Sequence, residues 1–339
     1  RIDFSNDAKG ALLLEPQRIN YIPYSALDFD GGVNPNGWSI GFGTGSYSYE
    51  QLEYKGQKAV KQTQITTGRS YLDTGSISIL ANTEHTLKIQ FILNECVADA
   101  NDNILSFLGF GAYAIYKFSD IDSNGVLEIQ FNPLSDNVGS LRIGLGVDQN
   151  ATGGKSLAWA IPQLEQGSYA TSYIPTQGSA VTRIADTCNN SANAQVINST
   201  EGVLYAQISA LSDSGDTYRL IGLNNGSGTN TNRIFIGYTN NNSIYAAIND
   251  TTIAFTVSSF DVKNFNKVAV VYNGSIAKLF INGSEVGSGI TNAPTLSGLS
   301  RVDFSGSSTG ANEFKGNTKD VRVYNTALTD TELQALTRI

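Results

Sequence analysis

The sequence predicts an all-β protein with two antiparallel β-sandwich (jelly-roll) domains in tandem. Short apolar runs that alternate with polar residues recur at spacings of about 8–12 residues, as in sandwich folds. The chain has 34 glycines and only 15% charged residues, which favours many turns and few helices. Its 339 residues suffice for two such domains, each with a core of its own.

The first set of strand signals runs from residue 19 to about residue 176. Residues 86–93 alternate and then become apolar, and residues 125–131 alternate cleanly, so we expect one face of each strand to be buried. Residues 156–164 close this set and contain Trp159, which we expect in the core.

The second set of strand signals begins near residue 202. Two of its strands run into Asn273-Gly274 and Asn282-Gly283, which are strong signals for two-residue hairpin turns. Thr329 and Glu332 form a capping-box pattern that predicts one short helix near the C-terminal end. We expect Leu333, Leu336 and Leu328 to face the sandwich.

A small, polar stretch separates the two sets of strands. Ile174 precedes Pro175, which favours extended backbone there, and no helical periodicity is present. We therefore expect four segments, which are a lead-in strand or docked arm, a first domain, a linker and a second domain: residues 1–18, 19–177, 178–194 and 195–339.

The end of the first strand set carries a recognisable run, Gln163-Leu-Glu-x-Gly-Ser-x-Ala-Thr-Ser-Tyr-Ile-Pro-Thr176. It resembles the closing signature of carbohydrate-binding-module-like jelly rolls in bacteriophage tail and fibre proteins. Residues 12–20 and 199–205 match the same family. Residues 320–330 are similar to the end of laminin-G or concanavalin-like lectin domains. The resemblance implies a jelly roll followed by a lectin-like sandwich.

Charge and hydropathy exclude several kinds of partner. The formal net charge is −8 and no Lys/Arg cluster is present, so neither nucleic acid nor an anionic membrane is expected as a partner. No apolar run approaches the roughly 20 residues that span a bilayer, so no membrane insertion is expected. No signal peptide is visible, and because the chain starts at Arg1 and contains no Met, we expect it to be part of a longer or processed product.

Four aromatic residues are the candidate sugar-binding residues, because pyranose C–H faces pack on aromatic rings. Trp38, Tyr47, Tyr49 and Tyr54 cluster in a Gly-rich stretch that reads as a loop, and packing within the fold is the alternative role. The Asn-rich loops of residues 224–242 are predicted mainly to form turns, and they are the second candidate site.

Two segments could bind Ca²⁺. Asp120, Asp122 and Asn124 with Gly125 resemble the start of a calcium loop, but position twelve is Phe131, so an ordinary Asn-Gly hairpin is the alternative.

The resemblance also implies a structural calcium where the chain enters the jelly roll. Asp28 and Asp30 are the candidate ligands there.

No catalytic residues are predicted. The Glu-x-Asp-x-x-Glu run of concanavalin-like hydrolases is missing, and Glu50/Glu53, Asp28/Asp30 and Asp213/Asp216 read as loop pairs. His85 is the single histidine, and we expect it in a solvated turn.

Cys96 and Cys188 fit no metal-binding spacing. We expect two free thiols, with a disulfide between the first domain and the linker as the alternative.

These features favour non-catalytic recognition of a host or environmental surface polysaccharide. The resemblance implies a phage virion protein of the tail or fibre, which contacts other virion proteins and forms a homo-oligomer, most simply a trimer. One alternative is a bacterial secreted adhesin, or the binding module of a polysaccharide-degrading enzyme, which would be extracellular or on the cell surface. The other is a purely structural virion decoration or spacer protein.

Overall fold

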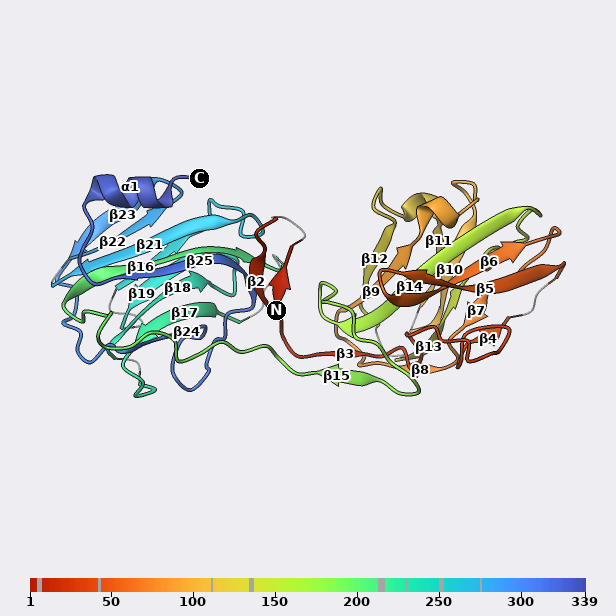
Figure 1. Ribbon diagram of the computed structural model, residues 1–339, viewed down its shortest axis with the longest axis horizontal. Coiled ribbons are helices and arrows are strands. Elements are labelled where there is room, and N and C mark those ends of the chain that lie inside the picture. Colours follow the sequence, from red (N-terminus) through yellow and green to blue (C-terminus); the bar gives the residue numbers. More distant parts are fainter. Residues whose placement is uncertain are drawn as a thin grey trace. The chain divides into compact units, whose positions relative to one another are not determined.

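A computed structural model describes residues 1–4, 8–41, 44–110, 112–133, 137–212, 217–229, 231–249, 253–274 and 276–339. The chain forms two compact units (Figure 1). Residues 17–184 make up one, here called the inserted unit, because it interrupts the other in sequence. Residues 1–16 and 185–339 together make up the second, here called the split unit. The N-terminal arm is therefore a part of the split unit and not a separate lead-in.

The inserted unit is a sandwich of antiparallel sheets. One sheet has the strand order β11-β10-β13-β7-β4, with β8 also pairing with β13, and the other has the order β12-β9-β14-β6-β5. A two-stranded ribbon, β3-β15, joins the segments through which the chain enters and leaves the unit. The strands are β3 (Arg18–Asn20), β4 (Ser39–Ile40), β5 (Tyr47–Tyr54), β6 (Gln57–Gln64), β7 (Leu72–Asp73), β8 (Ile77–Ser78), β9 (His85–Phe91), β10 (Asn103–Gly109), β11 (Ala112–Lys117), β12 (Val126–Phe131), β13 (Val138–Ile143), β14 (Lys155–Gln166) and β15 (Val181–Arg183).

The core of the inserted unit lies between its two larger sheets. Leu87 and Ile89 of β9 are fully buried, as is Leu105 of β10 in the facing sheet. Trp159 of β14 is also fully buried, which confirms its predicted place in the core. The alternating pattern of residues 125–131 corresponds to β12, where Leu127 and Ile129 are buried between exposed neighbours.

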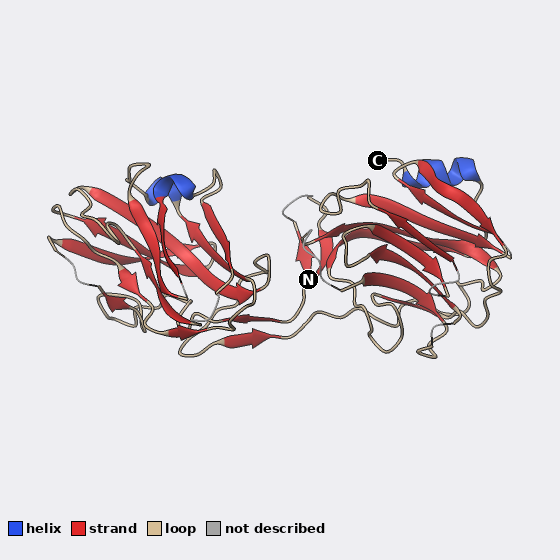
Figure 2. Ribbon diagram, turned by 180° about the vertical axis from the view of Figure 1, so that it is seen from behind, coloured by secondary structure: helices blue, strands red, loops and turns tan. Residues whose placement is uncertain are grey.

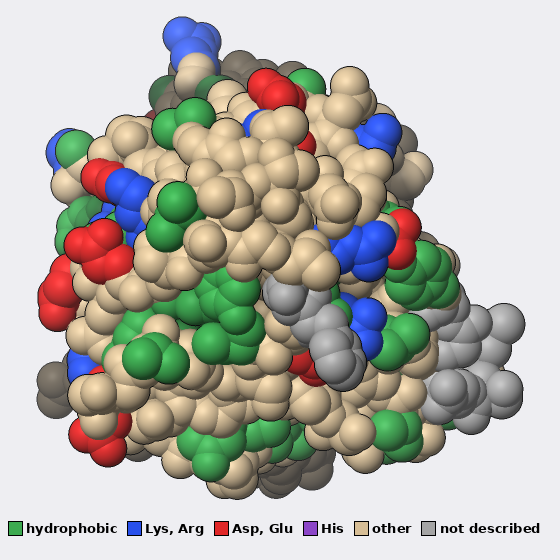
Figure 3. Space-filling view, turned by 90° about the vertical axis from the view of Figure 1, so that its right-hand side faces the viewer, with side chains coloured by type: hydrophobic (Ala, Val, Ile, Leu, Met, Phe, Trp, Pro, Cys, Tyr) green, Lys and Arg blue, Asp and Glu red, His purple; other side chains and the backbone are tan. Residues whose placement is uncertain are grey.

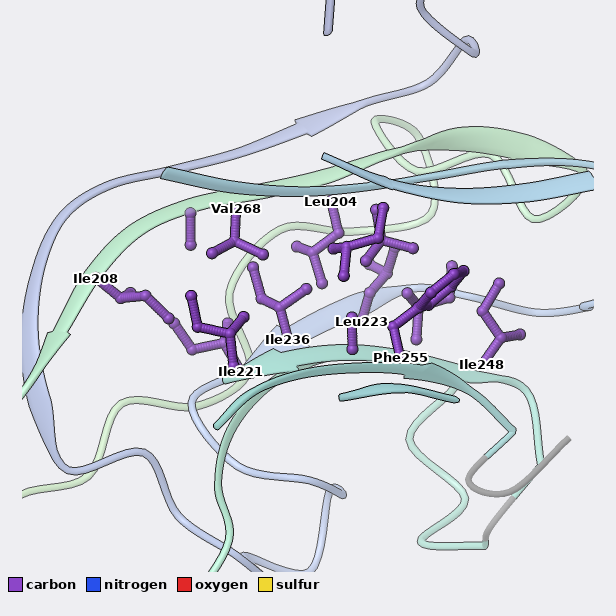
Figure 4. Packing of buried hydrophobic residues seen from close by; sticks show 14 of the residues in the cluster. Leu204, Ile208, Ile221, Leu223, Ile236, Ile248, Phe255 and Val268 are labelled. Carbon is purple, nitrogen blue, oxygen red and sulfur yellow. The ribbon is translucent and has the colours of Figure 1, made fainter. Parts of the chain in front are cut away.

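The split unit is a second antiparallel sandwich. Its sheets have the orders β1-β2-β25-β16-β21-β22-β23 and β20-β19-β18-β17-β24. Figure 4 shows side chains such as Leu204 and Val268 from one sheet meeting Ile221 and Ile236 from the other. The strands are β1 (Ile2–Asp3), β2 (Ala11–Leu14), β16 (Glu201–Ala210), β17 (Arg219–Asn224), β18 (Arg233–Tyr238), β19 (Ile244–Ile248), β20 (Ile253–Val257), β21 (Asn266–Asn273), β22 (Ile276–Ile281), β23 (Ser284–Thr291), β24 (Arg301–Asp303) and β25 (Gly316–Tyr324).

One of the two predicted turns of this unit, Asn282-Gly283, and the predicted helix are confirmed, whereas the turn predicted at Asn273-Gly274 runs into residue 275, outside the described residues. Asn282 and Gly283 join β22 to β23 with φ values of 50° and 88°, the positive pair that a type I′ turn requires. Helix α1 (Asp330–Thr337) starts at the predicted capping box of Thr329 and Glu332. It is the one α-helix in the parts of the chain that the structure describes, and strands dominate both units (Figure 2).

Helix α1 covers the outer face of the larger sheet of the split unit. Leu333 is fully buried there among Val203, Tyr205 and Phe280. Leu328 and Leu336 pack at the border of the same cluster, as predicted.

The N-terminal arm adds two strands to this sheet. Strand β2 pairs with β25, and Leu14 enters the core of the split unit at 3% exposure. The segments that leave for the inserted unit and return from it are paired by hydrogen bonds from Glu15 N to Asp186 Oδ2 (3.0 Å) and from Asp186 N to the Glu15 carbonyl oxygen (2.9 Å). Arg1 lies 3.2 Å from the Glu15 carboxylate. Hydrogen bonds and an ion pair therefore hold both ends of the arm in place.

Two of the segments that carry the family resemblance, residues 12–20 and 163–176, are joined by one buried side chain. Asn20 is fully buried in β3. Its Nδ2 donates to the Ile174 carbonyl oxygen at 2.9 Å, and its Oδ1 accepts the backbone N–H groups of Ile22 and Leu164 at 3.2 and 3.1 Å. One amide side chain thus ties the beginning of the unit to its closing strand and to the segment that follows.

Two side chains of residues 163–176 satisfy backbone groups after β14. Gln163 Oε1 accepts the N–H of Ile174 at 2.6 Å. The buried Glu165 carboxylate accepts the N–H and hydroxyl of Thr171 at 2.7 and 2.6 Å, and its burial raises the pKa of Glu165 above the usual range. Buried backbone groups need such partners, so the run specifies how the chain leaves the sandwich.

The expectation of a solvated His85 is wrong. His85 is the first residue of β9 and is fully buried, with its ring 5.8 Å from that of Tyr21 and 5.9 Å from that of Phe131. Nδ1 lies 2.8 Å from the carbonyl oxygen of Thr83. The histidine follows a polar segment but already belongs to the strand. Its aromatic neighbours come from segments far away in sequence, so the local sequence does not reveal them.

We expect the stability of the inserted unit to fall as the pH decreases from about 7 to about 5. Burial lowers the pKa of His85 below its ordinary value of 6.5, so the unfolded chain takes up a proton that the folded chain excludes. The contribution of His85 to the free energy of unfolding is fully present above the pKa that the histidine has in the unfolded chain. It is lost as the pH falls from that pKa toward the lower pKa of the folded protein. Denaturant unfolding followed by tryptophan fluorescence at several pH values measures this. His85→Gln should show a smaller loss over the same interval, and an equal loss in both proteins would contradict the assignment.

Both cysteines are free, so the alternative of a disulfide between Cys96 and Cys188 is not realised. Among the described residues, no helix has the length and apolar character needed to cross a membrane.

Candidate functional site

A cavity on the inserted unit lies between the edge strands of its two larger sheets. Strand β5 is the last strand of one sheet and β4 the last of the other, so the sandwich is open between them. A groove of about 580 Å³ occupies this place, within the range of about 300–1,000 Å³ that is typical of ligand sites. It is lined by Gly32, Val33, Ile40, Tyr47, Ser48 and Tyr49.

Strand alternation directs two tyrosines into this groove. Tyr47 and Tyr49 are two residues apart on β5, so their side chains point to the same face of the sheet. Their rings meet edge to face with centroids 5.7 Å apart, and both side chains are partly exposed. The expected loop is therefore a strand, and its alternation brings together two of the four predicted residues.

Buried amides support the two tyrosines from the neighbouring strand. Tyr47 pairs with Gln64 and Tyr49 with Gln62, and both glutamines are fully buried. Ser70 Oγ donates to Gln64 Oε1 at 2.7 Å, and Gln62 Nε2 donates to the Ser70 carbonyl oxygen at 2.6 Å. A satisfied buried network of this kind fixes the position of the strand beneath a site.

The groove offers apolar surface and almost no charge. None of the described residues that line it is Asp, Glu, His, Lys or Arg, and burial raises the pKa of Tyr49 well above that of a free tyrosine. Figure 3 faces this side of the unit and shows hydrophobic side chains as a patch within a mostly uncharged surface. Ring faces beside aliphatic groups suit the C–H faces of sugars.

Two of the predicted sugar-binding residues lie elsewhere. Trp38 is 3% exposed, packs on Trp159 with ring centroids 5.1 Å apart, and donates from Nε1 to the carbonyl oxygen of Tyr24 at 2.7 Å. It is a core residue and presents no ring face to a ligand. Tyr54 is an odd number of residues from Tyr47 and Tyr49, so it points to the opposite face of β5, where it packs beside Leu52.

The groove also contains residues that the sequence did not single out. Val33 is 74% exposed in the loop before β4, and Ile40 lies at the end of β4. A long loop that folds back beside an edge strand leaves no periodic signal, so only the exposure of Val33 in the folded chain reveals it.

Asp28 and Asp30 line a separate pocket of about 290 Å³ together with Asn36 and Thr176. A hydrogen bond from Lys58 at 2.6 Å lowers the pKa of Asp28, so this carboxylate already has a cationic partner. The predicted calcium site stays a prediction, which Ca²⁺ titration calorimetry on the wild type and on Asp28→Asn tests.

Asp120 and Asp122 are used by the turns in which they lie. Asp120 Oδ2 accepts the N–H of Lys117 at 2.8 Å, and Asp122 Oδ1 accepts those of Asn124 and Val126 at 2.9 and 2.7 Å. These hydrogen bonds belong to local turns in the connection from β11 to β12. The alternative of an Asn-Gly hairpin is wrong, because β11 and β12 pair in different sheets, and the calcium site here stays a prediction. In the described residues, no group of three or more His, Cys, Asp and Glu side chains is placed to hold a metal ion.

The acidic pairs considered for catalysis are not arranged as a pair around the groove. Glu50 and Glu53 lie on β5 and not in a loop, and their spacing directs them to opposite faces of the strand. Asp213 and Asp216 lie outside the described residues.

Residues 190–334 match the family model of the concanavalin A-like lectin and glucanase superfamily, Laminin_G_3. This segment runs from before β16 into α1 and covers most of the split unit. The match identifies the split unit as similar to a lectin-like sandwich, in agreement with the resemblance of residues 320–330. A comparison with curated protein sequences finds no match.

Several solved structures are similar in part. One is the Ruminococcus gnavus IT-sialidase CBM40 bound to α2,3-sialyllactose, at 18% identity and a TM-score of 0.37, covering 45% of this chain and 97% of that chain. Another is the leech intramolecular trans-sialidase complexed with 2,7-anhydro-Neu5Ac, at 20% identity and a TM-score of 0.34, covering 45% of this chain and 27% of that one. A third is the heptameric SAP-like pentraxin of Limulus polyphemus, at 13% identity and a TM-score of 0.33, covering 44% and 72%.

Proposed function

We propose that the protein recognises a glycan without catalysing a reaction, and that the groove between β4 and β5 is the binding site. The observation that carries the proposal is the pair of partly exposed rings, Tyr47 and Tyr49, set 5.7 Å apart in an uncharged groove of about 580 Å³. The lectin-like family match of residues 190–334 supports glycan binding as the class of function.

The absence of catalysis is part of the proposal. Glycoside hydrolysis by the common mechanisms needs two carboxyl groups about 5–10 Å apart across the scissile bond. No Asp, Glu or His is among the described residues that line the groove, and His85 is enclosed by aromatic rings in the core. Release of reducing ends by the purified protein would overturn this part.

The biological setting that we propose is attachment of a phage virion, as a tail or fibre protein, to the surface polysaccharide of its host. Support comes from the resemblance of residues 163–176 to such proteins. A trimer in the parent assembly would repeat the groove and raise a weak affinity through effective concentration. Imaging of the parent particle tests this, and a bacterial adhesin, a binding module of an enzyme and a virion spacer are the competing outcomes.

We expect Tyr47→Ala and Tyr49→Ala each to weaken glycan binding at least tenfold, because each removes one ring of the platform. Single-site affinities should be micromolar to millimolar, roughly −4 to −8 kcal/mol. A host-glycan array with the multimerised full chain, followed by titration calorimetry on the retained glycans, measures the effect.

Tyr54→Ala is the matched control, since it removes the same side chain from the same strand on the opposite face. Its affinity should stay within about twofold of the wild type. Binding that is unchanged in all three variants would place the site elsewhere, with the Asn-rich loops of the split unit as the next candidate. If the multimerised wild type retains no host glycan, the spacer function is favoured.

A further inference from the structure

We propose that the groove between β4 and β5 selects neutral sugars that carry a methyl group, namely a 6-deoxyhexose or an N-acetylhexosamine, over acidic sugars. This inference rests on the proposed function. It deepens it by naming the chemical class that the lining recognises.

The lining of the groove offers no positive charge to an acidic sugar. Gly32, Val33, Ile40, Tyr47, Ser48 and Tyr49 provide no cation. A uronic or sialic acid bound here would lose water around its carboxylate without gaining an ionic partner, which is unfavourable.

The cations of the neighbouring strands are already engaged. Arg69 donates to the carbonyl oxygen of Asp148 at 2.6 Å, and Arg142 Nε lies 3.0 Å from the carboxylate of Asp73. Lys58 is paired with Asp28 at 2.6 Å. An acidic sugar in the groove would compete with Asp73 for Arg142 and with Asp28 for Lys58.

Aliphatic side chains lie beside the rings. Val33 is 74% exposed, and Ile40 lies across the groove from β5. A sugar whose only substituents are hydroxyl groups can cover the tyrosine rings with its C–H face. Its hydroxyl groups would then face the apolar side chains of the valine and the isoleucine. A methyl group on the sugar would pack against the valine side chain, so that both lose contact with water. This favours binding about fourfold per methyl.

The lining has few polar groups. Among the described lining residues, Ser48 provides the one hydroxyl side chain other than the tyrosine phenols. Sites that discriminate by hydroxyl pattern need several placed hydrogen-bonding groups, whereas this lining mainly distinguishes apolar from polar surface.

The test is titration of the full chain with matched oligosaccharide pairs. The pairs are 6-deoxyhexose against the parent hexose, N-acetylhexosamine against the parent hexose, and uronic acid against the parent hexose. We expect one of the first two pairs to favour the methyl-bearing sugar by about fourfold or more, and the uronic acid to bind more weakly than its parent. Which pair responds identifies the source of the methyl group.

Val33→Ser removes the exposed aliphatic group. It should abolish the preference for the methyl-bearing sugar, so that both sugars of a pair bind about equally, while binding through the tyrosines remains. Val97→Ser is the matched control, because Val97 is 61% exposed in the same unit and is not part of the groove lining. It should leave the preference unchanged.

The failures of the two proposals are distinguishable. Equal affinity for methyl-bearing and parent sugars, or tighter binding of the uronic acid, would overturn the selectivity while loss of binding in Tyr47→Ala still upheld the site. Binding that survives Tyr47→Ala, Tyr49→Ala and Val33→Ser alike would overturn both.

Discussion

Deletion of residues 1–16 is expected to lower the free energy of unfolding of the split unit by about 4 kcal/mol or more, and to leave the inserted unit unchanged. Leu14 is 3% exposed in the core of the split unit, and Leu12 packs against the same core. Loss of one buried leucine side chain costs about 2–5 kcal/mol. The deletion also removes the strand that pairs with β25.

The two tryptophans make the effect separable. Trp38 and Trp159 are the only tryptophans and both lie in the inserted unit, so tryptophan fluorescence follows that unit alone. Far-UV circular dichroism follows both units. The deletion should shift the transition seen by circular dichroism without moving the fluorescence transition.

A circular permutant provides the control. Residues 185–339 joined to residues 1–16 by a flexible Gly/Ser linker should regain the lost stability without the inserted unit. Residues 195–339, the domain predicted from sequence, lack the arm and should be less stable than this permutant. Equal stability of the two would show that the arm contributes nothing.

Replacement of Asn20 by alanine should destabilise the inserted unit by about 3 kcal/mol or more. The side chain is fully buried and makes hydrogen bonds with Ile22, Leu164 and Ile174, whose backbone groups would lose their partners. Each buried polar group left unsatisfied costs about 1–3 kcal/mol.

Asn101→Ala is the matched control, because Asn101 is exposed in the same unit and makes one long contact of 3.4 Å with Lys117. It should change stability by less than about 0.5 kcal/mol. Denaturant unfolding followed by tryptophan fluorescence measures both variants. A loss of less than 1 kcal/mol in Asn20→Ala would show that water replaces the amide.

The fold class followed from local pattern, since strand alternation, Asn-Gly turns and the capping box at Thr329 are properties of neighbouring residues. The arm did not, because the apolar run of residues 11–14 gives no sign of which sheet it joins. Its partner strand, β25, lies some 300 residues away in sequence, and pairing at that distance is decided by packing.

Two of the four predicted sugar-binding residues, Tyr47 and Tyr49, line the candidate groove. Tyr47 and Tyr49 were identified by residue type. Tyr54 was grouped with them because the stretch reads as a loop in sequence; in the strand β5 it points to the opposite face of the sheet. Trp38 and His85 were both misplaced, because aromatic or polar neighbours in sequence say nothing about rings that arrive from other strands, such as Trp159 and Phe131.

The antiparallel pairing of β2 with β25 determines how tension passes along the chain. Residue 1 and residue 339 belong to the same sandwich, so a pull applied between them is borne by α1 and by the pairing of β1 with β2 and of β2 with β25 before it reaches the inserted unit. The inserted unit, bypassed by this route, stays free of force until β2 has peeled away. Its two ends are moreover held together by the β3-β15 ribbon, which keeps the groove between β4 and β5 unstrained while the other sandwich carries the load.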